Sequence, residues 1–97
     1  MTMSPAQLRA DLAQALLAPR DAEEMERLLV DLTTPQELHA LAERWQVAKL
    51  LDAGRPYREI GAATGVSTTT VTRVARFLRH EPHGGYRLAL DRLTTQA

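Results

Sequence analysis

The segment from Tyr57 to Phe77 restricts the possible folds of this chain more than any other part of the sequence. Gly65 lies between two runs of helical length, and a sharp turn between helices favours a residue that can adopt positive φ. Gly61, four residues earlier, supplies the small side chain needed where two helices cross closely. The apolar positions expected around the turn hold Ile60, Val66, Val71 and Val74, with Thr64 as the polar exception. The spacing predicts a helix-turn-helix over residues 57–79, although an ordinary helical hairpin with a glycine turn would show a similar pattern.

The second helix of this motif, from Thr68 to about Arg79, begins with an unusual run of β-branched residues. They are Thr68, Thr69, Thr70 and Thr72. Their restricted χ1 angles disfavour a helix, but their hydroxyl and methyl groups can contact base edges and phosphates. The alternative is a tolerant surface that merely holds threonines. The candidate DNA-contacting residues are Arg58, Ser67, Thr68, Thr69, Thr70, Thr72, Arg73 and Arg76. Ser67 is also the predicted N-cap of the second helix.

Helices account for the rest of the chain as well, because apolar residues recur at intervals of three and four and turn residues separate the runs. A first helix is expected over residues 4–18, and a second begins at Asp21, where Glu24 completes a pattern like a capping box. A last helix, marked by Tyr86, follows a loop that includes Gly84 and Gly85. The sequence predicts an all-α fold of about six helices in a single domain that covers residues 1–97.

The longest predicted helix starts at Thr34-Pro35-Gln36-Glu37, where Thr34 and Glu37 can form a capping box. It ends at Gly54, a candidate left-handed cap that Pro56 follows. Its apolar positions are Leu38, Leu41, Ala42, Trp45, Ala48 and Leu51. They predict core and dimer contacts rather than a ligand site.

Charge is distributed unevenly along the chain, although its formal net charge is zero. Residues 1–42 hold three arginines against seven acids, and residues 43–97 hold nine basic residues against five acids. Five arginines and a single acid, Glu59, lie within residues 53–80. A basic C-terminal half indicates nucleic acid as a partner on that side, unless the imbalance is chance on a solvated surface.

The residue inventory offers little for other chemistry. The chain has no cysteine, and His80 and His83 are a weak metal signal because zinc needs three or four ligands in fixed geometry. His39 is expected to be exposed, outside any ligand cluster. No set of residues suits nucleophilic catalysis or phosphate cradling, so we expect no enzyme and no metal site. Without an apolar run long enough for a membrane span, or a signal peptide, the expected location is the cytoplasm.

Beyond the generic motif, the sequence from about Leu29 to Leu93 resembles the tryptophan-repressor-like superfamily, in particular its YerC/YecD branch. The matching residues include Thr34-Pro35-Gln36-Glu37, Leu41 to Ala48, Leu51, Gly54, Tyr57, Ile60, Thr64 to Ser67, Thr70 to Val74, Gly85-Tyr86 and Asp91 to Leu93. The resemblance implies an intertwined homodimer in which the N-terminal helices and residues 34–53 form the core and the dimer interface. Each helix-turn-helix unit would enter a major groove. The resemblance also implies that Arg58 contacts a base and that the four threonines lie on the DNA-reading surface.

The resemblance further implies an effector site, because family members grip tryptophan with residues that align with Thr34, Arg44 and Arg73. Two neighbouring positions differ. Val74 stands where tryptophan-binding proteins have a glycine, and Phe77 stands where they have a serine. Both changes add bulk, so we expect that tryptophan is not a corepressor here and that the chain responds to another small molecule or to none. Arg44 and Arg73 could alternatively be plain surface or salt-bridge residues.

The sequence therefore predicts a dimeric, sequence-specific transcriptional regulator of double-stranded DNA. Repression at a palindromic operator is the expected action, with amino-acid biosynthesis genes as targets that the resemblance suggests. The alternative is a protein-interaction module that retains a helix-turn-helix shape without binding DNA.

Overall fold

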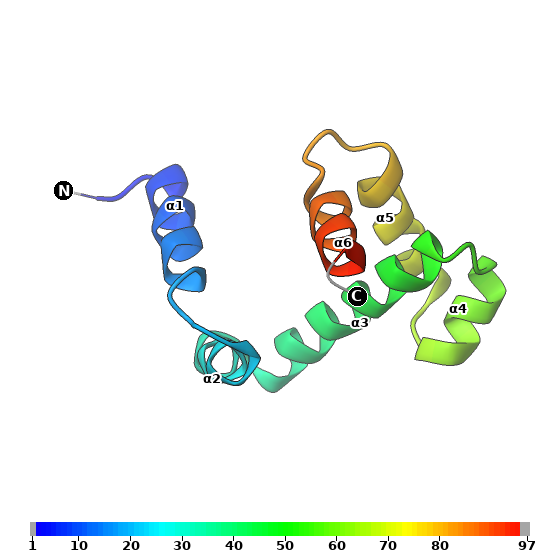
Figure 1. Cartoon of the computed structure of the whole chain (residues 1–97), viewed down its shortest axis with the longest axis horizontal. Coiled ribbons are helices and arrows are strands. Elements are labelled where there is room, and N and C mark those ends of the chain that lie inside the picture. The colour runs from blue at the N-terminus through cyan, green and yellow to red at the C-terminus, as the bar shows by residue number, and fades with distance from the viewer. Residues whose placement is uncertain (1, 96–97) are drawn as a thin grey trace. The chain divides into compact units, whose positions relative to one another are not determined.

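The computed structural model describes residues 2–95, which form six helices and no strand (Figure 1). The helices are α1 (Pro5–Leu16), α2 (Ala22–Leu32), α3 (Pro35–Asp52), α4 (Tyr57–Thr64), α5 (Thr68–Arg79) and α6 (Gly85–Thr95). The prediction of an all-helical chain with about six helices is confirmed. Its boundaries hold to within one or two residues, and α6 begins at Gly85, one residue before Tyr86.

Side-chain caps fix the starts of the early helices. The Glu37 amide donates to Thr34 Oγ1 at 3.1 Å, and the Thr34 amide donates to Glu37 Oε1 at 2.8 Å, so the predicted capping box of α3 is present. This second hydrogen bond lowers the pKa of Glu37. At α2 only half of the expected box forms. Asp21 accepts from the Glu24 amide at 2.9 Å, but the Glu24 carboxylate accepts from the amide of Arg20 instead of Asp21.

The chain divides into two compact units, Met1–Leu38 and His39–Ala97, and α3 begins in the first and continues into the second. In the first unit neither α1 nor α2 contains a buried residue. Several apolar side chains there are exposed, namely Leu8, Leu12, Leu17, Val30 and Leu32. The apolar stripes of these two helices therefore lack the cover that a helix of a folded domain normally has.

The hydrophobic core lies in the second unit and joins four helices. Its buried members are Val47, Ala48 and Leu51 of α3, Ile60 of α4, Val71, Val74 and Ala75 of α5, and Leu90 of α6. Trp45 and Tyr86 pack against this core and stack on each other, with ring centroids 6.5 Å apart. The C-terminal half of α3 thus supports both the helix-turn-helix and α6 (Figure 1).

The structure divides the predicted apolar stripe of α3 between the core and the exposed surface. Ala48 and Leu51 are buried as expected, but Leu41 is 45% exposed and Ala42 is also exposed. Val47, which lies outside the predicted stripe, is fully buried. Apolar residues are spread around α3, so the 3.6-residue period does not single out the side that contacts the core.

An ion-pair network joins the end of α3 to α6. Arg87 Nη1 lies 2.8 Å from Asp52 Oδ1, and Arg87 Nη2 lies 2.7 Å from Asp91 Oδ1. The hydrogen bonds from Arg87 hold the pKa of Asp52 below its ordinary value, and both carboxylates raise the pKa of Arg87. These side chains are partly exposed, so the network adds modestly to the contact between α3 and α6.

Substitution by alanine should change the stability of the chain in opposite directions at two glycines of the motif. Gly65 has φ +76°, so Gly65→Ala should destabilise the chain by about 1 kcal/mol. An added Cβ at Gly61 would lie 3.6 Å from Val66 O, an ordinary contact, so the small residue expected there need not be glycine. Gly61→Ala should stabilise by ~0.5–1 kcal/mol because alanine favours a helix. Urea unfolding followed by circular dichroism measures both, and equal losses for the two variants would contradict the assignment.

The Arg87 network should make stability depend on acidic pH. The folded-state pKa of Asp52 is lowered, so its contribution is present above the unfolded pKa and is lost as pH falls through the folded value. Arg87→Gln should therefore lower the melting temperature near neutral pH and converge with wild type in acid. Arg92→Gln, at an exposed arginine of the same helix, is the control. A difference between wild type and Arg87→Gln that stays constant from pH 7 to strong acid would disprove this role.

Candidate nucleic-acid interface

The helix-turn-helix consists of α4, a three-residue turn and α5. Gly65 adopts the left-handed conformation, with φ 76° and ψ 4°, and its amide donates to Gly61 O at 2.8 Å. The chain therefore leaves α4 sharply and re-enters a helix at Thr68. The predicted turn glycine is confirmed.

Hydrogen bonds explain the single polar residue in the motif core. The Thr64 hydroxyl donates to Ile60 O at 2.7 Å and accepts from the Val66 amide at 3.3 Å. Both bonds are local and occupy the hydroxyl, so this half-buried side chain does not bring an unsatisfied polar group into the core. Ile60 is buried as predicted, and Val66 is partly buried against the same core.

The first turn of α5 is held by a side-chain cap. The Thr70 amide donates to Ser67 Oγ, and the two hydroxyl oxygens are also 3.2 Å apart. Ser67 is thus the N-cap that the sequence predicts. Both hydroxyls already have a partner in the free chain, and Thr70 is partly buried. Among the predicted contact residues, Ser67 and Thr70 therefore have a structural task at the start of α5.

The remaining threonines lie on the outer face of α5. Val71, Val74 and Ala75 are buried on the inner face, where they fix the helix against the core. Three of the predicted contact residues are exposed on the other side, namely Thr68, Thr69 and Thr72. The structure thus combines a firmly packed inner face with a surface of free hydroxyl and methyl groups.

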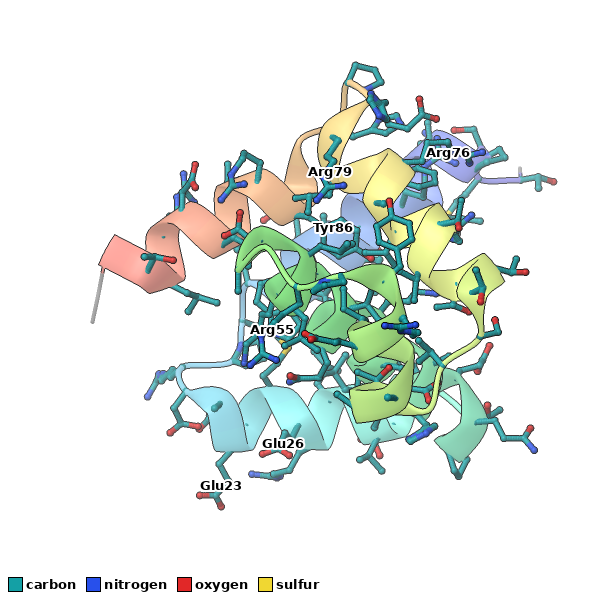
Figure 2. The ribbon with its side chains drawn as sticks, turned by 90° about the vertical axis from the view of Figure 1, so that its right-hand side faces the viewer. Glu23, Glu26, Arg55, Arg76, Arg79 and Tyr86 are labelled. Atoms are coloured by element: carbon teal, nitrogen blue, oxygen red, sulfur yellow. The ribbon has the colours of Figure 1, made fainter. Side chains whose placement is uncertain are left out.

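The arginines continue this outer face toward the C-terminus of α5. Arg73 and Arg76 lie four residues beyond Thr69 and Thr72, so each arginine neighbours a threonine on the helix surface. Both arginines are exposed, and Arg76 and Arg79 can be followed on α5 in Figure 2. Arg58 is exposed on α4. The interface therefore offers hydroxyls at the start of α5 and cations along its second half.

The three candidate effector residues belong to different structural settings. Thr34 caps α3 in the first unit, while Arg44 is half-buried on α3 in the second unit. Arg73 lies on α5 with its Cζ atom 4.7 Å from the centroid of the Phe77 ring. Val74 is 1% exposed and belongs to the core. The side chain that adds bulk at this position is therefore part of the packing and does not line an open site.

The sequence did not predict one feature of this region, a contact between two rings. The rings of Phe77 and His83 stack, with centroids 6.1 Å apart and planes inclined by 19°. They line a shallow pocket of about 300 Å³ together with Gly84, Gly85 and Tyr86. Sequence proximity of an aromatic residue to a His-Gly-Gly loop was the available signal, but the loop conformation that closes the distance was not predictable from spacing.

Within residues 2–95 no three His, Asp or Glu side chains gather where they could hold a metal ion. His39 is exposed as expected and pairs with Glu43 on α3 at 3.3 Å. No helix in the same range is both long and apolar enough to cross a membrane.

Comparison with known sequences places the chain in a protein family. The sequence matches the family described as Trp repressor protein over residues 7–94. The match begins within α1, so it reaches further toward the N-terminus than the resemblance noted from Leu29 onward. An uncharacterized protein of Bacillus subtilis strain 168, YerC, is 40% identical over 82 residues, which cover 84% of this chain and 78% of that protein.

Solved structures show the same fold. A TrpR-like protein from Eubacterium eligens is 36% identical and superposes with a TM-score of 0.85, covering 91% of this chain and 90% of that one. A candidate Trp repressor from Staphylococcus aureus is 33% identical, with a TM-score of 0.84 and 96% of both chains covered. The fold and the sequence thus agree along most of the chain.

Proposed function

The chain belongs to the Trp repressor protein family, a family of DNA-binding regulators, and we propose that it is a sequence-specific transcriptional regulator acting as a homodimer. The observation that carries this proposal is the outer face of α5. Its threonines and arginines stay exposed while the opposite face is buried, which is the division that a helix in the major groove requires. Arg58 on α4 is the proposed base contact outside α5, and Ser67 and Thr70 complete the reading surface.

Exposed apolar side chains support the dimer. Leu8, Leu12 and Leu17 in the first unit and Leu41 and Leu93 in the second are all more than 40% exposed. A second copy of the chain would cover such surfaces at low cost, as in the intertwined dimer that the resemblance implies. Two-fold symmetry then requires a palindromic operator with half-sites about 10 bp apart.

The proposed mechanism is occlusion, in which the bound dimer blocks initiation of transcription. The family supports a regulator, and we extend this to a repressor, with amino-acid biosynthesis genes as the proposed targets and the cytoplasm as the proposed location. The proposal assigns no enzymatic activity to the chain. Arginines that contact phosphates should make the affinity fall steeply with salt.

We also propose that tryptophan is not the corepressor. The position of Val74 is filled by a side chain that belongs to the core, and the Phe77 ring already occupies the surroundings of Arg73. Both side chains are bulkier than the glycine and serine that the resemblance implies for a tryptophan site. Thr34, Arg44 and Arg73 remain candidate contacts for a different small molecule.

Selection from a random duplex-DNA library, with the purified chain and no added ligand, should enrich one palindromic motif. Arg58→Ala should then weaken binding to that motif by roughly 10- to 100-fold and relax the preference at one base pair, because a bidentate base contact is worth about 1–3 kcal/mol. Arg92→Ala, at an exposed arginine outside the helix-turn-helix, should leave the affinity for the motif nearly unchanged.

Sedimentation equilibrium of the purified chain should give twice the mass of one chain.

Two results would count against this function. Absence of any enriched motif, together with equal behaviour of Arg58→Ala and wild type, would favour an interaction module that retains the helix-turn-helix shape. A monomer at micromolar concentration would contradict the symmetric operator.

Isothermal titration of tryptophan into the chain should show no saturable heat, because Val74 and Phe77 fill space that the ligand would need. Val74→Gly combined with Phe77→Ser introduces the small residues of tryptophan-binding family members and should produce binding, with circular dichroism as the check that the variant is folded. Tight binding of tryptophan to the wild-type chain would refute the proposal.

A further inference from the structure

Two cations share one aromatic ring on α5. The Cζ atom of Arg73 lies 4.7 Å from the centroid of the Phe77 ring, and that of Arg76 lies 5.0 Å from it. Both distances fall within the range of a cation–π contact. The negative face of the ring attracts a guanidinium group, so the two arginines have a common partner on α5.

The ring is itself held in place. Phe77 is half-buried, and the His83 ring from the loop after α5 stacks on it at 19° between planes. Gly84, the next residue, has φ +69°, a conformation that lets the loop fold back toward α5. Phe77 thus lies between its own helix and the loop, where its ring can support longer side chains.

The supported arginines lie where the proposed interface needs cations. Arg73 and Arg76 follow Thr69 and Thr72 by one turn on the outer face of α5, away from the buried Val74. A long arginine side chain loses much rotamer entropy when it binds a phosphate. A guanidinium that stacks through its face can still donate hydrogen bonds through its edge. Preorganisation by a ring would therefore lower the entropic cost without blocking the contact.

We propose that Phe77 is a positioning residue that holds Arg73 and Arg76 ready to bind DNA phosphates. This inference rests on the proposed DNA-binding function and deepens it. The role is one of orientation, because Phe77 supplies no polar group of its own. It predicts that removing the ring weakens binding on every duplex alike while leaving base preference unchanged, since phosphates carry no sequence information.

Phe77→Leu is the informative substitution, because leucine keeps an apolar side chain and removes the π face. We expect affinity for the selected operator and for a scrambled duplex to fall by a similar factor, about three- to tenfold, in fluorescence anisotropy. Phe77→Tyr keeps the ring and should bind within about twofold of wild type. Circular dichroism should show wild-type helix content for both variants.

A double-mutant cycle separates positioning from general packing. In a chain that already carries Arg73→Ala and Arg76→Ala, adding Phe77→Leu should have little further effect on DNA affinity, because no cations remain to be oriented. An equal effect of Phe77→Leu with and without the arginines would show a structural role only and would overturn the inference. Unchanged affinity of the Phe77→Leu chain would overturn it as well.

A measurement on the free protein distinguishes failure of this inference from failure of the proposed function. The ¹⁵Nε order parameters of Arg73 and Arg76 should be high in wild type and in Phe77→Tyr, and should fall in Phe77→Leu. Equal mobility in all three would refute the positioning role even if the protein binds DNA. Conversely, ordered arginines in a wild-type chain that binds no duplex would remove the proposed function and the role of Phe77 in it.

Discussion

Packing of eight buried side chains between α3, α4, α5 and α6 is the contact on which the second unit depends. Ile60, Val71 and Val74 belong to the helix-turn-helix, and they meet Val47 and Leu51 of α3 in the same cluster. Close packing leaves little freedom for one of these helices to shift alone. The direction in which α5 presents its outer face is therefore set by the same contacts that stabilise the fold.

The outer face of α5 is a compromise between helix stability and the proposed contact with DNA. Thr68, Thr69 and Thr72 are poor helix formers, and their side chains gain little from burial. The cap at Ser67 and the buried inner face offset this weakness. Beyond the threonines the face becomes cationic, and the Phe77 ring gathers two of its arginines. The buried face of α5 thus stabilises the helix, and the exposed face carries the polar and cationic groups of the proposed interface.

Local signals in the sequence were sufficient for most of the fold. The left-handed turn at Gly65, the capping box of Thr34 and Glu37 and the cap at Ser67 each depend on a few neighbouring residues, and all three are present. Contacts between residues far apart in the sequence were harder to predict. Val47, outside the predicted apolar stripe, is buried and Leu41 within it is exposed, because α3 is apolar on several sides and its partners decide which side is covered.

The same distinction between local signals and long-range contacts applies to the candidate interface. By itself the sequence determined the helix order, the turn, the polar face of α5 and the resemblance to a regulator family, because these follow from residue type and spacing within one or two turns. Only the tertiary structure decided that Val47 of α3 is buried and that Arg87 ties α6 to Asp52. It also brought His83 and the guanidinium groups of two arginines against the ring of Phe77. The reason is physical, since such contacts depend on how helices and loops meet in space, which periodicity along the chain does not encode.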